Sequence, residues 1–151
     1  MLGLCPCGDP AEIAKKAASY EGSSDWAYGT SKGRFAKNTN KCNLFVEDTL
    51  KEKGSNVPDM NGLFSYNGPT AGQWGDPNVE IPGYPVVKTP QPGDIVAIPH
   101  RYGDATGHVG IVTAKGKTAS QSAITDAVEN NDWGFRPGQK PVFRRCTCPS
   151  K

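Results

Sequence analysis

The order of apolar and polar residues predicts two helices in the first third of the chain. The first is expected to begin after Asp9, which suits a helix N-cap, with Pro10 at the first helical position, and to run to about Tyr20. The second is expected to begin between residues 40 and 42, because apolar residues then recur at helical spacing. Gly54 follows at the position that is typical of a helix end.

After residue 92 the pattern changes to short apolar runs separated by turn residues, which predicts strands. The short connections between successive runs favour an antiparallel sheet. With the helices, these runs predict an α+β fold in which N-terminal helices pack on a small antiparallel β-sheet. The expected strands cover residues 94–98, 108–113, 122–128 and 141–145.

Residues 55–92 form a long stretch that is dense in glycine and proline and has no clear strand or long helix. Such a stretch is uncommon in a compact domain unless it has a function. We expect one short helix in it, near residues 70–74. With 151 residues, the whole chain (1–151) fits a single domain.

The net charge and the hydropathy of the chain restrict its expected binding partners and its expected location in the cell. The net charge is +2 and the basic residues are scattered, so nucleic acid is not an expected partner. No segment approaches the roughly 20 apolar residues that span a membrane, and the first residues lack the features of a signal peptide. We therefore expect synthesis in the cytoplasm and export, if any, without a cleaved leader.

The five cysteines form two terminal pairs and one single residue. Cys5 with Cys7 and Cys146 with Cys148 suit two disulfides that join the ends of the domain. A four-thiolate zinc site is less favoured because the one-residue spacing is tighter than usual, and unpaired thiols remain an alternative. Disulfides favour an oxidising destination, which requires dedicated export of a chain without a leader. Cys42 is left without a partner.

Cys42 is the candidate nucleophile, because the first turn of a helix is expected to lower the pKa of a thiol. His108, which opens an apolar strand, is favoured as the base over His100, which lies in a loop-like stretch. Glu129 or Asn131, at the end of the following expected strand, could orient the imidazole. The alternative is a buried, inert cysteine in a non-catalytic binding module.

These residues carry a resemblance to a known family. In the family's order, Cys-Asn-Leu-Phe-Val at 42–46, Pro-Gly-Asp-Ile-Val at 92–96, Gly-His-Val-Gly-Ile-Val at 107–112 and Glu-x-Asn at 129–131 resemble the CHAP and NlpC-type papain-like cysteine amidases. These enzymes cleave amide bonds in bacterial peptidoglycan. The Glu-x-Asn spacing is closer to the CHAP pattern than to the NlpC pattern.

The resemblance implies a papain-like fold and cysteine catalysis without a metal or an organic cofactor. It makes Cys42 the nucleophile, His108 the base, and Glu129 or Asn131 the third catalytic residue. The implied substrate is the peptide stem or cross-link of peptidoglycan.

A wall that selects the peptide stem is expected in the 55–92 segment, with Trp74 and Tyr84 as the residues that bind substrate.

The small size, the missing leader and the terminal cysteine pairs are also similar to the antibacterial amidase effectors of type VI secretion systems. That resemblance implies a monomer that is delivered to the periplasm of a target cell and is neutralised by a cognate immunity protein. A Cys–His acyltransferase or transpeptidase and a non-catalytic binding module are the alternatives. A phage endolysin domain and a fragment of a larger toxin also stay open.

Overall fold

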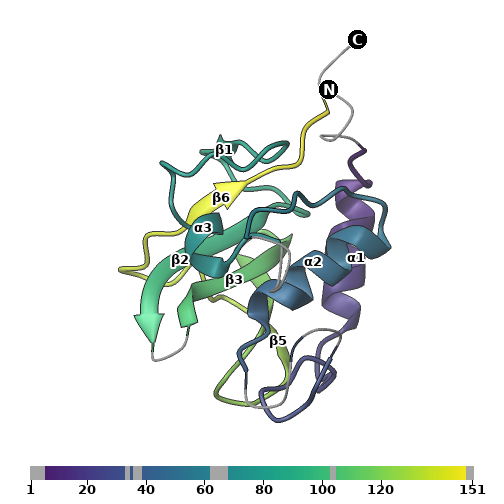
Figure 1. Cartoon of the computed structure of the whole chain (residues 1–151), viewed down its shortest axis with the longest axis vertical. Helices are drawn as coiled ribbons and strands as arrows, with labels where there is room; N and C mark the ends of the chain where they lie inside the picture. The colour runs from purple at the N-terminus through teal and green to yellow at the C-terminus, as the bar shows by residue number, and fades with distance from the viewer. Residues whose placement is uncertain (1–5, 33–34, 36–38, 62–67, 103–104, 149–151) are drawn as a thin grey trace.

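The computed structural model describes residues 6–32, 35, 39–61, 68–102 and 105–148. Within these residues, two helices from the N-terminal half lie together beside an antiparallel sheet (Figure 1). The helices are α1 (Pro10–Ser19), α2 (Cys42–Glu52) and α3 (Ala71–Trp74). The strands are β1 (Val86–Val87), β2 (Ile95–Tyr102), β3 (Ala105–Ala114), β4 (Lys117–Gln121), β5 (Val128–Asn131) and β6 (Val142–Arg144).

The strands form one sheet in the order β1-β6-β2-β3-β4-β5, and each neighbouring pair is antiparallel. β2 and β3 form the central hairpin, in which Ile98 pairs with His108. β4 and β5 extend the sheet and pair Ser120 with Glu129. The predicted combination of N-terminal helices with an antiparallel sheet is confirmed.

α1 begins where the sequence predicts it. The Asp9 carboxylate accepts a hydrogen bond from the Ala11 amide at 2.9 Å, and Pro10 occupies the first helical position. Ile13 and Ala17 lie on the buried face of the helix. α1 therefore packs against both α2 and β3.

α2 packs its apolar face against β3 and β4. Phe45 is fully buried and contacts the Trp26 ring edge-on, with ring centroids 5.0 Å apart. Val109 and Ile111 of β3 belong to the same hydrophobic core. The first residue of α2 is therefore held against the central hairpin by the packing of the whole helix.

The strand predicted over residues 122–128 is wrong: most of this segment is the turn between β4 and β5. The Ser122 hydroxyl accepts hydrogen bonds from the amides of Ile124 (3.1 Å) and Thr125 (3.4 Å), so these amides do not join a strand ladder. Asp126 has a φ of 57°, which belongs to a turn. The strand instead lies at Lys117–Gln121, a stretch that no predicted strand covers.

The 55–92 segment is organised by a buried arginine from the last strand. Arg144 is 2% exposed and donates hydrogen bonds to the carbonyls of Trp74 (2.9 Å), Tyr84 (3.0 Å), Asp76 (2.7 Å) and Val79 (2.8 Å). The short helix predicted near 70–74 is confirmed as α3, whereas the two-residue β1 was not predicted. The carbonyls of an irregular segment are thus hydrogen-bonded by one side chain that lies 60 to 70 positions away in the sequence.

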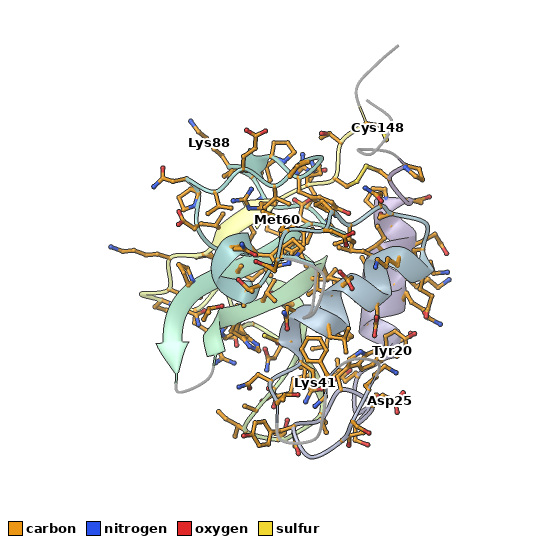
Figure 2. All side chains as sticks on the ribbon, in the orientation of Figure 1. Tyr20, Asp25, Lys41, Met60, Lys88 and Cys148 are labelled. Atoms are coloured by element: carbon orange, nitrogen blue, oxygen red, sulfur yellow. A yellow bond between two sulfur atoms is a disulfide. The ribbon has the colours of Figure 1, made fainter. Side chains whose placement is uncertain are left out.

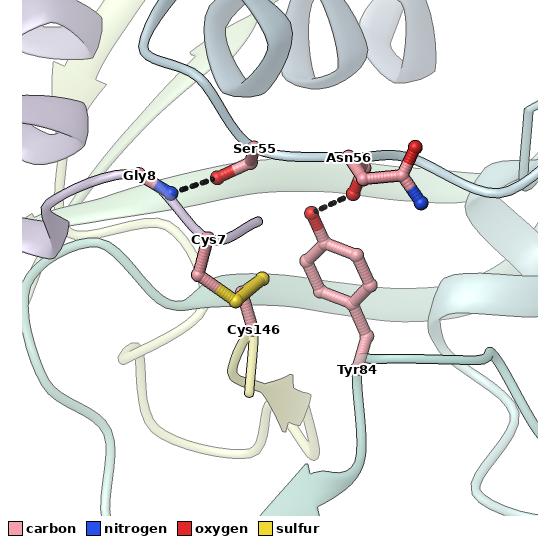
Figure 3. The surroundings of a disulfide bond; sticks show 6 residues. All are labelled: Cys7, Gly8, Ser55, Asn56, Tyr84 and Cys146. Atoms are coloured by element: carbon pink, nitrogen blue, oxygen red, sulfur yellow. Dashed lines mark hydrogen bonds between the residues drawn. A yellow bond between two sulfur atoms is a disulfide. The ribbon is translucent and has the colours of Figure 1, made fainter. Parts of the chain in front are cut away.

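A disulfide between Cys7 and Cys146 joins the two ends of the described chain (Figure 3). Beside it, the Gly8 amide donates to the Ser55 hydroxyl at 2.8 Å. Cys148 is also disulfide-bonded, and Cys5 lies outside the described residues.

Candidate active site

Cys42 is the first residue of α2 and carries a free thiol. Its side chain is 6% exposed and belongs to the hydrophobic core. The backbone amides of Cys42, Asn43 and Val109 interact with its sulfur. Because Val109 follows His108 in β3, this contact brings the nucleophile candidate to the strand that carries the base candidate.

The pKa of the Cys42 thiol is raised to about 11, and burial is the main cause. The amides of Val109, Asn43 and Cys42 act in the opposite direction but are outweighed. The predicted lowering of this pKa at a helix start is therefore wrong for the protein without substrate. The positive end of the helix is present, yet the loss of water around the sulfur is the larger effect.

His108 lies in β3 with its ring only partly exposed. Its Nε2 atom is 3.0 Å from the Ser120 hydroxyl, and its ring meets the Trp133 ring edge-on with centroids 4.5 Å apart. Burial lowers the pKa of His108 to about 4, and the nearby charge of Glu129 acts in the opposite direction. The imidazole is therefore neutral at pH 7 and can accept a proton.

Glu129 and Asn131 lie on β5, as neighbours on the same face of the strand. The Asn131 amide nitrogen is 3.3 Å from a Glu129 carboxylate oxygen, and its carbonyl oxygen accepts the Trp133 amide hydrogen bond at 3.0 Å. The structure therefore places His108, Glu129 and Asn131 in one cluster. Within the described residues, however, the hydrogen-bond partner of the His108 ring is Ser120 rather than either β5 residue.

Three residues at the site were not predicted: Ser120, Trp133 and Lys41. Ser120 and Trp133 contact the ring of His108 from separate parts of the chain. Pairing across β4 and β5 follows from the strand register, which the sequence pattern placed incorrectly. Ser120 lies outside every strand that the sequence predicts, so the sequence carried no local signal for it.

Lys41 precedes the nucleophile candidate and lies at the start of α2 (Figure 2). Its side chain is buried, with 1% exposed, and its Nζ atom donates to the carbonyls of Ala27 and Thr39, both at 3.0 Å, and of Tyr28 at 3.4 Å. Burial lowers its pKa, while the charge of Asp126 acts against this. Lys41 thereby ties the loop before α2 to the start of the helix.

The structure does not support Trp74 and Tyr84 as residues that bind substrate. Each side chain is 1% exposed, and the two rings pack edge-on with centroids 5.1 Å apart. The Tyr84 hydroxyl is used within the protein, where it donates to the Asn56 carbonyl at 2.7 Å (Figure 3). The apolar surface of both rings is buried in the core, so neither ring can contact a peptide stem.

His100 lies within β2 rather than in a loop, and its side chain is outside the described part of the structure. Among the described residues, no group of three or more His, Cys, Asp and Glu side chains is arranged to hold a metal ion. None of the described helices is long and apolar enough to cross a membrane.

A pocket of about 480 Å³ lies apart from this cluster and is lined by residues that include Trp26, Asp48 and Glu52. Its polar side chains are engaged with one another: the Trp26 ring nitrogen donates to Asp48 at 2.9 Å, and the Tyr20 hydroxyl donates to Glu52 at 2.6 Å. Cys42 and His108 are not among its lining residues.

Comparisons with known proteins identify a family model and a similar fold. The CHAP domain family model matches residues 33–126, a segment that includes Cys42 and His108 and ends before Glu129 and Asn131. No curated protein matches the chain significantly.

A chain in the crystal structure of the type VI native effector–immunity complex Tae3–Tai3 from Ralstonia pickettii has a similar fold. The TM-score is 0.53 at 20% sequence identity, and the similarity covers 92% of this chain and 99% of that chain. At this identity, the likeness concerns the fold alone.

Proposed function

Because the chain belongs to the CHAP domain family, we propose that it is a cysteine amidase that hydrolyses an amide bond in the peptide stem or cross-link of bacterial peptidoglycan. The observation that carries the proposal is the Cys42 sulfur at the first turn of α2, against the amide of the residue that follows His108. The nucleophile candidate thus lies against the strand that carries the base candidate, and both residues fall inside the segment that the family model matches. The proposed fold is a single papain-like domain that covers residues 1–151.

In the first half of the reaction, the Cys42 thiol transfers its proton to the neutral imidazole of His108 as the sulfur attacks the scissile carbonyl carbon. The new C–S bond moves an electron pair onto the carbonyl oxygen. The backbone amides at the start of α2 stabilise this oxyanion. When the oxyanion collapses, the C–N bond breaks, the amine leaves with the proton from His108, and a thioester remains on Cys42.

In the second half, His108 takes a proton from water, and the oxygen attacks the thioester carbonyl. The C–S bond then breaks and the carboxylic acid product leaves. The Cys42 sulfur recovers its proton from His108, so the enzyme returns to its starting state. Glu129 supports both halves because its negative charge favours the protonated form of His108.

Asn131 supports the reaction indirectly through its contacts. It contacts the Glu129 carboxylate through its amide nitrogen and holds the Trp133 amide through its carbonyl oxygen. Trp133 in turn packs against the His108 ring. Of the two residues proposed as the third catalytic residue, Glu129 has the electrostatic influence on His108, and Asn131 arranges its surroundings.

We further propose that the chain acts as an antibacterial effector that a type VI secretion system delivers to the periplasm of a target cell. The support is the fold shared with a chain of a type VI effector–immunity complex along almost the whole length of both chains. In this role it acts as a monomer, and the producing cell protects itself with a cognate immunity protein. The disulfide between Cys7 and Cys146 suits an oxidising destination.

The test is digestion of purified sacculi by the wild-type protein and by Cys42→Ala, with released fragments identified by mass spectrometry. The wild type is expected to release fragments, and their masses identify the bond that is cut. Cys42→Ala is expected to release none, because it keeps the fold but lacks the sulfur. Ser19→Ala, an exposed change at the end of α1, serves as the control that retains activity.

Absence of fragments with the wild type would contradict hydrolysis of peptidoglycan. Equal release by the wild type and Cys42→Ala would contradict cysteine catalysis. Transfer of an acyl group to an added amine in place of water would instead favour the acyltransferase alternative.

A further inference from the structure

We propose that Ser120 is the positioning residue for His108, and that it connects the imidazole to Glu129. The hydroxyl would hold the ring in the tautomer with a proton on Nε2, which leaves Nδ1 free to accept the proton of Cys42. This inference rests on the proposed cysteine hydrolase function, and it assigns a role to a residue that the sequence pattern did not single out.

The geometry places Ser120 between the other two residues. Its hydroxyl oxygen is 3.0 Å from Nε2 of His108, which is a hydrogen-bonding distance. In the sheet, Ser120 pairs directly with Glu129 across β4 and β5. Paired residues of antiparallel strands project to the same face, so Ser120 and Glu129 are neighbours on the face where His108 lies.

The position of Ser120 is closely constrained. The residue is 3% exposed, so its hydroxyl is largely shielded from bulk water. Gly110, two residues after His108, lies so near that a Cβ atom there would be 2.9 Å from the Cβ of Ser120. The two strands therefore approach closely enough that the hydroxyl stays beside the ring.

The direction of the hydrogen bond follows from an inventory of protons. A neutral imidazole has one N–H donor and one acceptor nitrogen, and a serine hydroxyl has one donor and two acceptor sites. Glu129, which pairs with Ser120 across the strands, is an anion without a donor, so its charge orients the hydroxyl with the proton toward the carboxylate and a lone pair toward Nε2–H. The arrangement fixes the unprotonated nitrogen as Nδ1.

The same arrangement suits the protonated ring that forms during the reaction. After His108 takes the proton of Cys42, Nε2–H remains a donor to Ser120, and no group has to rotate. Glu129 favours the positive charge of the ring. Asn131 is 3.3 Å from the Glu129 carboxylate and keeps it at its place on β5.

The test uses the full-length protein and combines NMR of the imidazole nitrogens with activity. The chain has two histidines, so His100→Gln assigns the His108 signals. In the wild type we expect one tautomer, with the proton on Nε2. In Ser120→Ala we expect a mixture of tautomers and about a tenfold lower rate of sacculus digestion, because the ring is no longer held.

A double-mutant cycle with Glu129→Gln tests the connection. If Glu129 acts through Ser120, Glu129→Gln changes both the His108 signals and the rate of sacculus digestion in the wild-type background. In the Ser120→Ala background, the same substitution should change each readout by less than about twofold. Thr113→Val is the matched control: it removes a hydroxyl that donates to Asn130 at 2.7 Å in the same sheet, and it should leave both readouts unchanged.

Two results would overturn the inference: a wild-type proton on Nδ1 instead of Nε2, or additive effects of Ser120→Ala and Glu129→Gln. The wild-type tautomer is measured without Ser120→Ala, so misfolding of that variant cannot hide the answer. If the wild type does not digest sacculi, the proposed function fails while the NMR cycle still tests Ser120. If sacculi are digested but the effects are additive, the role of Ser120 fails and the hydrolase stands.

Discussion

At the scale of single residues, burial shifts the pKa values of Cys42 and His108 in opposite directions. The pKa of Cys42 is raised to about 11 and that of His108 is lowered to about 4. Between these values both side chains are neutral, because each charged form lacks the water that would stabilise it. The resting site therefore holds a thiol and an imidazole, and the charges arise only when a proton passes between them.

This neutral pair predicts how Cys42 reacts with iodoacetamide in the absence of substrate. The thiolate is the reactive form, so the alkylation rate should rise about tenfold per pH unit between pH 7 and 10, below the raised pKa. Mass spectrometry of the labelled protein gives the rate, and Cys42→Ala gives the background. A rate that is constant from pH 5 upward would instead reveal a thiolate–imidazolium pair.

The lowered pKa of His108 predicts a loss of stability in mild acid. An unfolded histidine titrates near 6.5, so between pH 6.5 and about 4 the unfolded chain binds more protons than the folded one. The contribution of this neutral histidine is complete above pH 6.5 and is lost as the pH falls to about 4, by up to about 3 kcal/mol.

Urea unfolding of the wild type and of His108→Gln across this pH range checks the prediction. The difference between the two free energies of unfolding should shrink as the pH falls, because the variant lacks the titrating ring. Parallel curves would contradict the assignment of this pH dependence to His108.

At the scale of elements, the site depends on how closely β3 and β4 approach. Gly110 permits this approach, since a Cβ atom there would lie 2.6 Å from the Ala119 carbonyl oxygen and 2.6 Å from a Thr118 methyl carbon. The contact with the Ala119 carbonyl involves the backbone, which cannot change rotamer to make room as a flexible side chain can. Because Gly110 has no side chain, β3 and β4 can lie this close together. This short distance between the strands also allows the contact of Ser120 with His108.

We therefore predict that Gly110→Ala destabilises the protein by about 2 kcal/mol, because the sheet must shift to admit the methyl group. Chemical denaturation measures the change. Gly29→Ala is the matched control, because a Cβ atom there meets nothing within 4 Å, and it should change the free energy of unfolding by less than about 0.5 kcal/mol. Equal stability of the two variants would contradict close strand contact at Gly110.

The extent to which elements could be predicted differs between helices and strands. α1 and α3 carry local signals, in the Asp9 cap and in the Thr70 capping box, and both were placed correctly. β4 was misplaced because Ser122 satisfies the amides of Ile124 and Thr125 with its own side chain. A short apolar run does not reveal whether its backbone bonds to a neighbouring strand or to a turn.

At the scale of the whole molecule, the ends of the chain are tied together. The Cys7–Cys146 disulfide joins residues 139 positions apart, so it closes a loop of almost the entire chain. Such a link strongly reduces the conformational entropy of the unfolded chain. It costs the folded state little, because the two ends already lie side by side there. The disulfide therefore stabilises the fold as a whole rather than one element.

Reduction of the disulfides is predicted to lower the free energy of unfolding by about 5 kcal/mol in the chain-entropy model. The measurement is urea unfolding with and without dithiothreitol, in the Cys42→Ala background so that the free thiol cannot exchange. An unchanged unfolding midpoint after complete reduction would contradict this role of the terminal bridges.

The sequence by itself determined which residues could carry the chemistry. A cysteine at a predicted helix start, a histidine at the head of an apolar strand and the spacing of Glu129 and Asn131 are local features, and local features are readable from spacing. The same holds for the antiparallel character of the sheet, which follows from short connections between strands.

Only the tertiary structure decided what surrounds those residues. Ser120 and Trp133 reach His108 through strand register and a turn, and the burial of Trp74 and Tyr84 depends on Arg144 from the far end of the chain. Contacts of this kind depend on three-dimensional packing, which no local spacing specifies. The pKa of Cys42 makes the same point, because desolvation by the assembled core outweighs the effect of the helix that the sequence predicts.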